Sequence, residues 1–194
     1  MSDNLGTLGA SLGGILNIGI LPIRDSVISN NGGEDVGGVL NEGTLKIRNT
    51  AFVGNVSVAN HGGGIHNRGT LEIVDSTFSR NRVPDGLGGG IQNSGFLTVK
   101  RSLFAENRGD HSGGGISNGG TANVDQCTFF QNLGGFFGFG CGGSTTAAYS
   151  PSRTVHFRAM LLPGAAVSSP QVRWLSRTAS SRTTRVHWWW YSAP

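Results

Sequence analysis

The chain of 194 residues is poor in cysteine, in charged residues and in long apolar runs, and each shortage excludes a class of protein. Its two cysteines, Cys127 and Cys141, are too few for the disulfide framework of a small secreted domain, and they leave open either one bridge or two free thiols. No run approaches the ~18 apolar residues that a membrane-spanning helix needs. The N-terminus has no basic segment before its apolar residues, so it does not resemble a secretory signal peptide.

Acidic residues and glycine are missing from one end of the chain, which divides it into two parts. Residues 1–143 hold 32 of the 33 glycines and all eleven acidic residues beside nine basic ones, for a net charge of −2. Residues 144–194 hold six arginines, all four tryptophans and no acidic residue, for a net charge of +6. We expect a repeat domain over 1–143 and a basic tail over 144–194 that is disordered or out of frame with it. Because the basic excess lies in the tail, the folded part is not expected to bind nucleic acid.

Helical periodicity is also missing, and a repeat of 24–26 residues takes its place. Each of five units has a glycine pair, then a branched apolar residue, then an asparagine two positions later. These anchor residues are Asn17, Asn41, Asn67, Asn93 and Asn118. Within a unit, Leu71 and Ile73 are two residues apart, as are Ser76 and Phe78, which is the period of a strand. The chain therefore predicts an all-β fold, a right-handed parallel β-helix (a pectate-lyase-like solenoid) of about five turns with a non-repeat C-terminal tail.

Residues that recur in every unit are expected to stack from one turn to the next. An aromatic column would fill the interior with Phe52, Phe78, Phe104 and Phe129. A second asparagine column closes the units with Asn31, Asn55, Asn81, Asn107 and Asn132. We expect these asparagines at corners, in the left-handed conformation, with amides that hydrogen-bond to one another. Cys127 falls in a column of small residues and is expected to be buried. Lys46 with Glu72, and Asp75 with Arg101, are expected to be neighbours on the solvated face.

The units resemble the repeats of bacterial polymorphic outer membrane proteins and related right-handed β-helix proteins. The resemblance rests on "GGI" at 63–65, 89–91 and 114–116, and on "FVGN" at 52–55, "FSRN" at 78–81, "FAEN" at 104–107 and "FFQN" at 129–132. It covers about residues 13–132. It implies a surface-exposed, outer-membrane or secreted adhesin-like module, part of a larger passenger-type protein, whose partner is a carbohydrate or a cell-surface protein.

Candidate sites lie in the loops between units. Asp85 and Asp110 each lie eight residues before an anchor asparagine, so both could contribute to one calcium site, although aspartate in a glycine-rich loop is also ordinary turn chemistry. Calcium is the only cofactor that the sequence suggests. Arg108, Gly109 and Asp110 form the tripeptide that integrins recognise, on a loop that we expect to be exposed. Three histidines lack the spacing of metal ligands and are expected at the surface: His61, His66 and His111.

Catalysis is the main alternative, because parallel β-helices include polysaccharide lyases and hydrolases. Such a site needs carboxylates in one column on adjacent turns. Asp25 and Asp75 share a column, but Asn49 lies between them and Arg101 follows, so the column is not a carboxylate cluster. We therefore favour a non-enzymatic contact module with no catalytic residue. The alternative is a carbohydrate-active enzyme, functional or degenerate.

Overall fold

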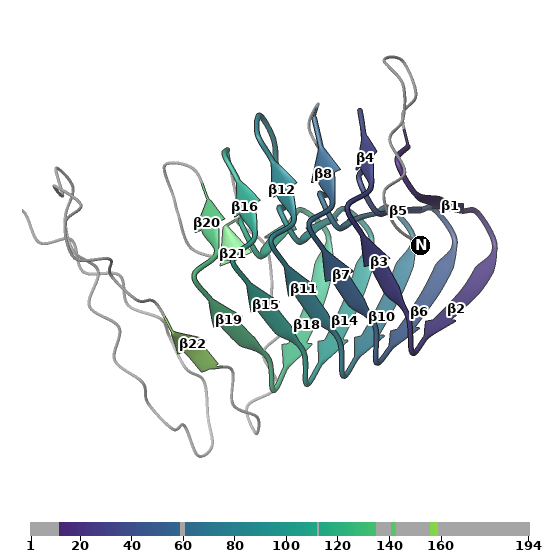
Figure 1. Cartoon of the computed structure of the whole chain (residues 1–194). Helices are drawn as coiled ribbons and strands as arrows, with labels where there is room; N and C mark the ends of the chain where they lie inside the picture. Colours follow the sequence, from purple (N-terminus) through teal and green to yellow (C-terminus); the bar gives the residue numbers. More distant parts are fainter. Residues whose placement is uncertain (1–11, 59–60, 112, 135–140, 143–155, 159–194) are drawn as a thin grey trace, which may run out of the picture.

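The computed structural model describes residues 12–58, 61–111, 113–134, 141–142 and 156–158, and these form a parallel β-solenoid of about five turns (Figure 1). Each full turn contributes four short strands, which pair with their equivalents on the neighbouring turns to form four parallel sheets. Among the described residues there is no helix, and hence none that could cross a membrane. The predicted parallel solenoid is confirmed. Its fourth strand was not predicted, because a two-residue strand shows no apolar alternation.

The first sheet carries the anchor asparagines. Its strands are β1 (Ile15–Asn17), β5 (Val39–Asn41), β9 (Ile65–Asn67), β13 (Ile91–Asn93), β17 (Ile116–Asn118) and β21 (Cys141–Gly142). The strands pair in register, so that each anchor asparagine lies beside the next. Each Nδ2 donates to the following Oδ1, at 2.7, 2.7, 2.6 and 2.6 Å along the stack. This confirms the predicted anchor ladder.

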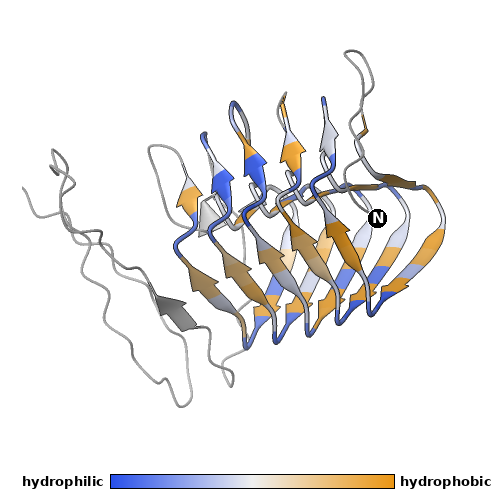
Figure 2. Cartoon of the chain, in the orientation of Figure 1, coloured by the Kyte–Doolittle hydropathy of each residue, from blue (hydrophilic) through white to orange (hydrophobic). Residues whose placement is uncertain are grey.

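The second sheet has the longest strands, of five residues each. They are β2 (Ile20–Arg24), β6 (Thr44–Arg48), β10 (Thr70–Val74), β14 (Phe96–Lys100) and β18 (Thr121–Asp125). Apolar residues alternate with polar ones along β6 and β18, and orange and blue bands mark this sheet in Figure 2, whereas β2 has Ile20 and Pro22 at exposed positions. In β10, Leu71 and Ile73 face inward and are buried, whereas Glu72 is exposed and lies in register beside Lys46, as predicted.

The third sheet carries the phenylalanine column. Its strands are β3 (Val27–Ser29), β7 (Ala51–Val53), β11 (Thr77–Ser79), β15 (Leu103–Ala105), β19 (Thr128–Phe130) and β22 (His156–Arg158). The predicted aromatic stack is confirmed, with ring centroids 4.7, 4.9 and 4.9 Å apart from Phe52 to Phe129 and nearly parallel planes. The strand β22 belongs to the predicted tail yet pairs with β19. The remainder of 144–194 lies outside the described residues.

The fourth sheet follows the closing asparagines. Its two-residue strands are β4 (Gly32–Gly33), β8 (Val56–Ser57), β12 (Arg82–Val83), β16 (Arg108–Gly109) and β20 (Leu133–Gly134). The second ladder is confirmed just before these strands, with amide-to-amide distances of 2.9–3.0 Å. Asn81 is typical, because its backbone N and its Nδ2 both donate to Oδ1 of Asn107 and its Nδ2 also donates to the carbonyl of Phe52.

The left-handed corners lie one residue before the closing asparagines, so that prediction was wrong. The residues with positive φ there are Asn30, Gly54, Arg80, Glu106 and Gln131. A ladder asparagine must direct its amide along the stack in the interior, and the preceding residue makes the turn instead. The side chain of that preceding residue points outward, which is why this position accepts arginine and glutamate.

The glycine pair is required for close approach between segments. A Cβ on Gly63 would lie 2.6 Å from the carbonyl oxygen of Gly89 and 2.7 Å from the backbone N of Arg82. Any side chain would therefore push neighbouring backbone apart. This accounts for a glycine pair in all five units at a place where no left-handed angle demands one.

Replacing Asn81 by alanine tests the ladder. The substitution leaves the buried carbonyl of Phe52 and the backbone N of Asn55 without their partner. We expect the free energy of unfolding, measured in urea, to fall by about 2–4 kcal/mol. The matched control is Asn123→Ala on the exposed outer face of β18, which should change it by less than about 0.5 kcal/mol. Equal losses in the two variants would contradict a structural role for the ladder.

Candidate functional site: a groove along one corner

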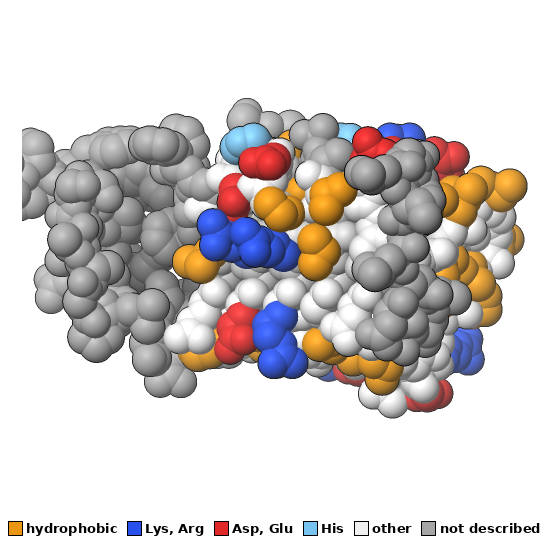
Figure 3. All heavy atoms as spheres, turned by 45° about the horizontal axis from the view of Figure 1, so that its top comes forward, with side chains coloured by type: hydrophobic (Ala, Val, Ile, Leu, Met, Phe, Trp, Pro, Cys, Tyr) orange, Lys and Arg blue, Asp and Glu red, His pale blue; other side chains and the backbone are white. Residues whose placement is uncertain are grey.

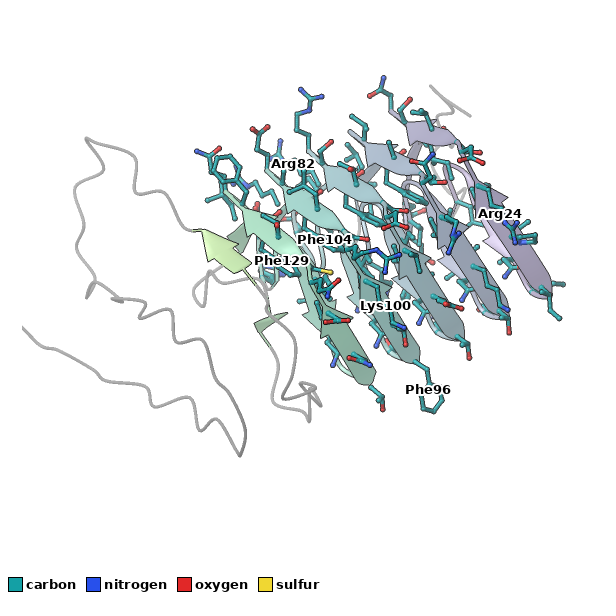
Figure 4. The ribbon with its side chains drawn as sticks, turned by 90° about the horizontal axis from the view of Figure 1, so that it is seen from below. Arg24, Arg82, Phe96, Lys100, Phe104 and Phe129 are labelled. Carbon is teal, nitrogen blue, oxygen red and sulfur yellow. The ribbon has the colours of Figure 1, made fainter. Side chains whose placement is uncertain are left out.

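Two open hollows lie end to end along the corner between the second and third sheets, and we call them together the corner groove. The first has a volume of about 310 Å³ and the second about 360 Å³, and both are lined by Asp75 and Thr77. Figure 4 looks onto this corner, with Arg24 and Lys100 on the side of the second sheet. The groove runs parallel to the solenoid axis, so each turn contributes equivalent positions to it.

One side of the groove is a polar row that we call the corner column. It contains one residue from each turn, all with positive φ: Asp25, Asn49, Asp75, Arg101 and Gln126. A left-handed residue at a tight corner projects its side chain away from the core, and parallel register places each such side chain beside the next. The polar row is therefore a direct product of the turn geometry.

Side chains of the corner column hold one another in place. Nδ2 of Asn49 donates to Oδ1 of Asp25 at 2.7 Å. Arg101 binds Asp75 through two hydrogen bonds, from Nε at 2.7 Å and from its terminal nitrogen at 2.9 Å, which confirms the predicted pair. These hydrogen bonds lower the pKa of the Asp75 carboxyl, and the charges of Arg101 and Arg48 lower it further. Asp75 is thus held in its ionised form.

The opposite side of the groove is partly apolar. It is formed by the outward residues of the third sheet: Val27, Ala51, Thr77, Leu103 and Thr128. Val27 is 54% exposed and Leu103 is 36% exposed, so both offer apolar surface to a ligand. The groove thus has a hydrogen-bonding side and an apolar side along its length.

The floor is the column of small residues. The hydroxyls of Ser26, Thr50 and Ser102 each donate to the backbone carbonyl two residues earlier, at 2.6–2.8 Å. Cys127 takes the equivalent place on the last turn, is fully buried as predicted, and has a thiol pKa that burial raises. Cys127 is a free thiol in this structure, so it is not bridged to Cys141, whose side chain lies outside the described residues.

The predicted calcium residues do not meet in a metal cluster. Asp85 is exposed on the loop after β12, and the carboxylate of Asp110 accepts hydrogen bonds from Arg108. Among the residues that the structure describes, no three His, Cys, Asp or Glu side chains come close enough to share a metal ion. The calcium site stays a prediction without a third ligand.

The Arg108–Gly109–Asp110 tripeptide lies partly in a strand. Arg108 and Gly109 form the strand β16 and not a loop, and Gly109 is buried, whereas Arg108 is exposed as predicted. Figure 3 shows basic side chains gathered in a row on this face, where Arg82 and Arg108 are neighbours in register. Since Arg108 is bound to Asp110, a receptor would have to separate the two charges before contacting either.

His66 is buried, which corrects the prediction of a surface histidine. Its side chain is only 3% exposed, and the ring of His61 lies over it with centroids 4.5 Å apart. His61 Nδ1 is 2.8 Å from Oε1 of Gln92, which can only accept, so this nitrogen carries the proton. Burial, together with the smaller effects of the charges of His61 and Arg68, lowers the pKa of His66 to about 3.

The alternating pattern of β9 correctly places His66 on the outward face, but it does not show what covers that face. The one available signal is the length of the connection, because seven residues lie between Asn55 and Gly63 whereas five lie between Asn31 and Gly37. The corner groove was not predicted from the sequence, for a related reason. Its polar column could be identified from the spacing, but a hollow beside it depends on how two sheets meet.

Neither a protein-family model nor a curated protein nor a solved structure matches this chain. The fold and the corner groove are therefore argued from the residues of the chain itself.

Burial of His66 makes stability depend on pH. Since its pKa is about 3 in the fold and near 6.5 in the unfolded chain, the unfolded state binds more protons between these values. Stability is therefore complete above about pH 6.5 and falls as the pH drops through this window, by at most about 1.4 kcal/mol per pH unit. His66→Leu, which copies Leu40 of the preceding turn, should remove most of this slope in urea unfolding between pH 7 and pH 4. His111→Gln, at an exposed position, should leave it unchanged. An unaltered slope in His66→Leu would contradict the assignment.

Proposed function

We propose that the chain is a non-enzymatic contact module that binds a carbohydrate chain along the corner groove. The observation that carries the proposal is the pairing of a polar row, one side chain per turn, with a partly apolar row across the groove. A sugar ring has a hydroxyl edge and apolar C–H faces, so it can satisfy both rows at once. A linear glycan parallel to the solenoid axis would repeat the contact on successive turns, which raises the overall affinity of weak individual contacts.

Binding without catalysis is favoured by the state of the groove carboxylates. A general acid needs a carboxyl with a raised pKa, whereas Asp75 is held ionised by Arg101. Asp25 accepts a hydrogen bond from Asn49 and lies two turns away from Asp75. Neither residue is placed to donate a proton to a leaving group, which argues against the alternative of a lyase or hydrolase.

A location at the cell surface, or secretion as part of a larger passenger-type adhesin, is part of the same proposal. It is supported by the likeness of the Gly-Gly-Ile and Phe-x-x-Asn repeats to polymorphic outer membrane proteins. The ladders and the phenylalanine stack occupy the interior, so only outward positions can differ between turns without disturbing the fold. Such a scaffold suits a protein whose task is to present a surface. A cell-surface protein is the other class of partner that this surface could meet.

Thr77 offers the sharpest test, because it lines both hollows and points outward from β11. Thr77→Met should fill the middle of the groove and weaken binding to soluble polysaccharides at least tenfold, as measured by affinity electrophoresis. Thr98→Met makes the same change on the outer face of β14, away from the groove, and should bind like the unaltered chain.

The enzymatic alternative is tested on the same samples. Incubation with the bound polysaccharide should release neither reducing ends nor unsaturated products that absorb in the ultraviolet. Product formation that disappears in Asp75→Asn would overturn the proposal in favour of an enzyme. Equal binding by Thr77→Met and Thr98→Met would instead show that the groove is not the contact surface.

A further inference from the structure

We infer that the corner groove selects a neutral, hydroxyl-rich glycan over an acidic one. This inference rests on the proposed carbohydrate binding and adds the chemical class of the ligand. It comes from the balance of hydrogen-bond donors and acceptors in the first hollow, between Asp25 and Asp75.

The amide of Asn49 has a fixed orientation. Nδ2 of Asn49 donates to Oδ1 of Asp25 at 2.7 Å, so the NH₂ group of this amide faces Asp25. The carbonyl oxygen of the same amide is therefore turned away from Asp25. No donor among the described residues is bound to that oxygen.

The hydrogen bonds of the corner column point in the same direction along the stack, each from one turn to the preceding one. Asn49 donates toward Asp25, and Arg101 donates toward Asp75 from the far side. Among the described residues, no hydrogen bond joins Asn49 to Asp75, so the amide oxygen and the carboxylate are both left as acceptors on the lining of the first hollow. An acceptor pair of this kind is satisfied by a donor from outside the protein.

Donors elsewhere in the first hollow are already used. The hydroxyls of Ser26 and Thr50 donate to the carbonyls of Arg24 and Arg48, which leaves only their acceptor capacity toward the groove. The first hollow thus presents more hydrogen-bond acceptors than donors to a ligand. Among its described hydroxyls, that of Thr77 alone does not donate to a backbone carbonyl. A sugar hydroxyl supplies the donor that this surface requires.

An acidic glycan would meet like charge in the same place. Its carboxylate or sulfate would approach Asp25 and Asp75, and it brings acceptors where donors are needed. Arg101 is the one cation among the residues that line the two hollows, and both its directed hydrogen bonds go to Asp75. Arg24 and Arg48 lie at the ends of β2 and β6, outside this lining, and the charge of Arg48 acts on Asp75 from beside the groove.

Isothermal titration calorimetry with matched hexasaccharides tests the inference. The neutral probes are cellohexaose, xylohexaose and mannohexaose, and the acidic probe is hexagalacturonate, all at about 0.15 M salt so that long-range attraction is screened. We expect at least one neutral probe to bind at least tenfold more tightly than hexagalacturonate. Asp25→Asn keeps the shape and tolerates the left-handed angle but removes a charge and half of the acceptor capacity. It should weaken neutral binding at least threefold and narrow the preference. Asp85→Asn, the same change on a loop outside the groove lining, should alter neither.

The outcomes separate this inference from the proposed function. Tighter binding of hexagalacturonate, reduced by Thr77→Met, would overturn the selectivity while leaving the groove as a carbohydrate site. An unchanged preference in Asp25→Asn would also overturn it. Failure of all four probes to bind would overturn the proposed carbohydrate function together with the inference.

Discussion

The in-register stacking of each turn on the next is the constraint on which the rest of this structure depends. A buried carboxamide needs both a donor and an acceptor, and the same residue one turn away supplies both at the spacing of paired strands. A slip of one residue would turn Asn81 outward and leave apolar side chains without their stack. The asparagine ladders therefore fix the register, and the register in turn places Phe78 between Phe52 and Phe104.

That constraint also decides what the sequence can reveal. Inward residues must match their neighbours on both sides, so Asn67, Asn81 and Phe78 repeat and could be predicted from spacing alone. The left-handed corner was misplaced by one residue, because its side chain points to solvent and shows no repeat in residue type. Burial of His66 could not be predicted, since its cover comes from His61, which belongs to the connection between turns and not to the repeat.

Outward residues do not have to match their neighbours on adjacent turns, so the residue type at these positions can vary from turn to turn. The corner column carries an acid, an amide, an acid, a base and an amide in succession at one backbone position. The backbone of the solenoid sets the spacing between residues of this column, while the side chain at each position can differ independently of the others. This is why Asp25 and Asp75 were recognised from sequence as sharing a column, whereas the groove beside them required the meeting of two sheets.

The pair of Asp75 and Arg101 illustrates how stability and recognition are separated in such a fold. Both side chains are nearly half exposed, and an ion pair that solvent screens in this way contributes little to folding. The buried ladders and the phenylalanine stack hold the backbone without it. Its two hydrogen bonds instead fix the positions of the charges and hydrogen-bond acceptors in the groove before a ligand binds. This lowers the conformational entropy that is lost on binding. The interior of the solenoid thus supplies rigidity, and the corner is left to define what the protein contacts.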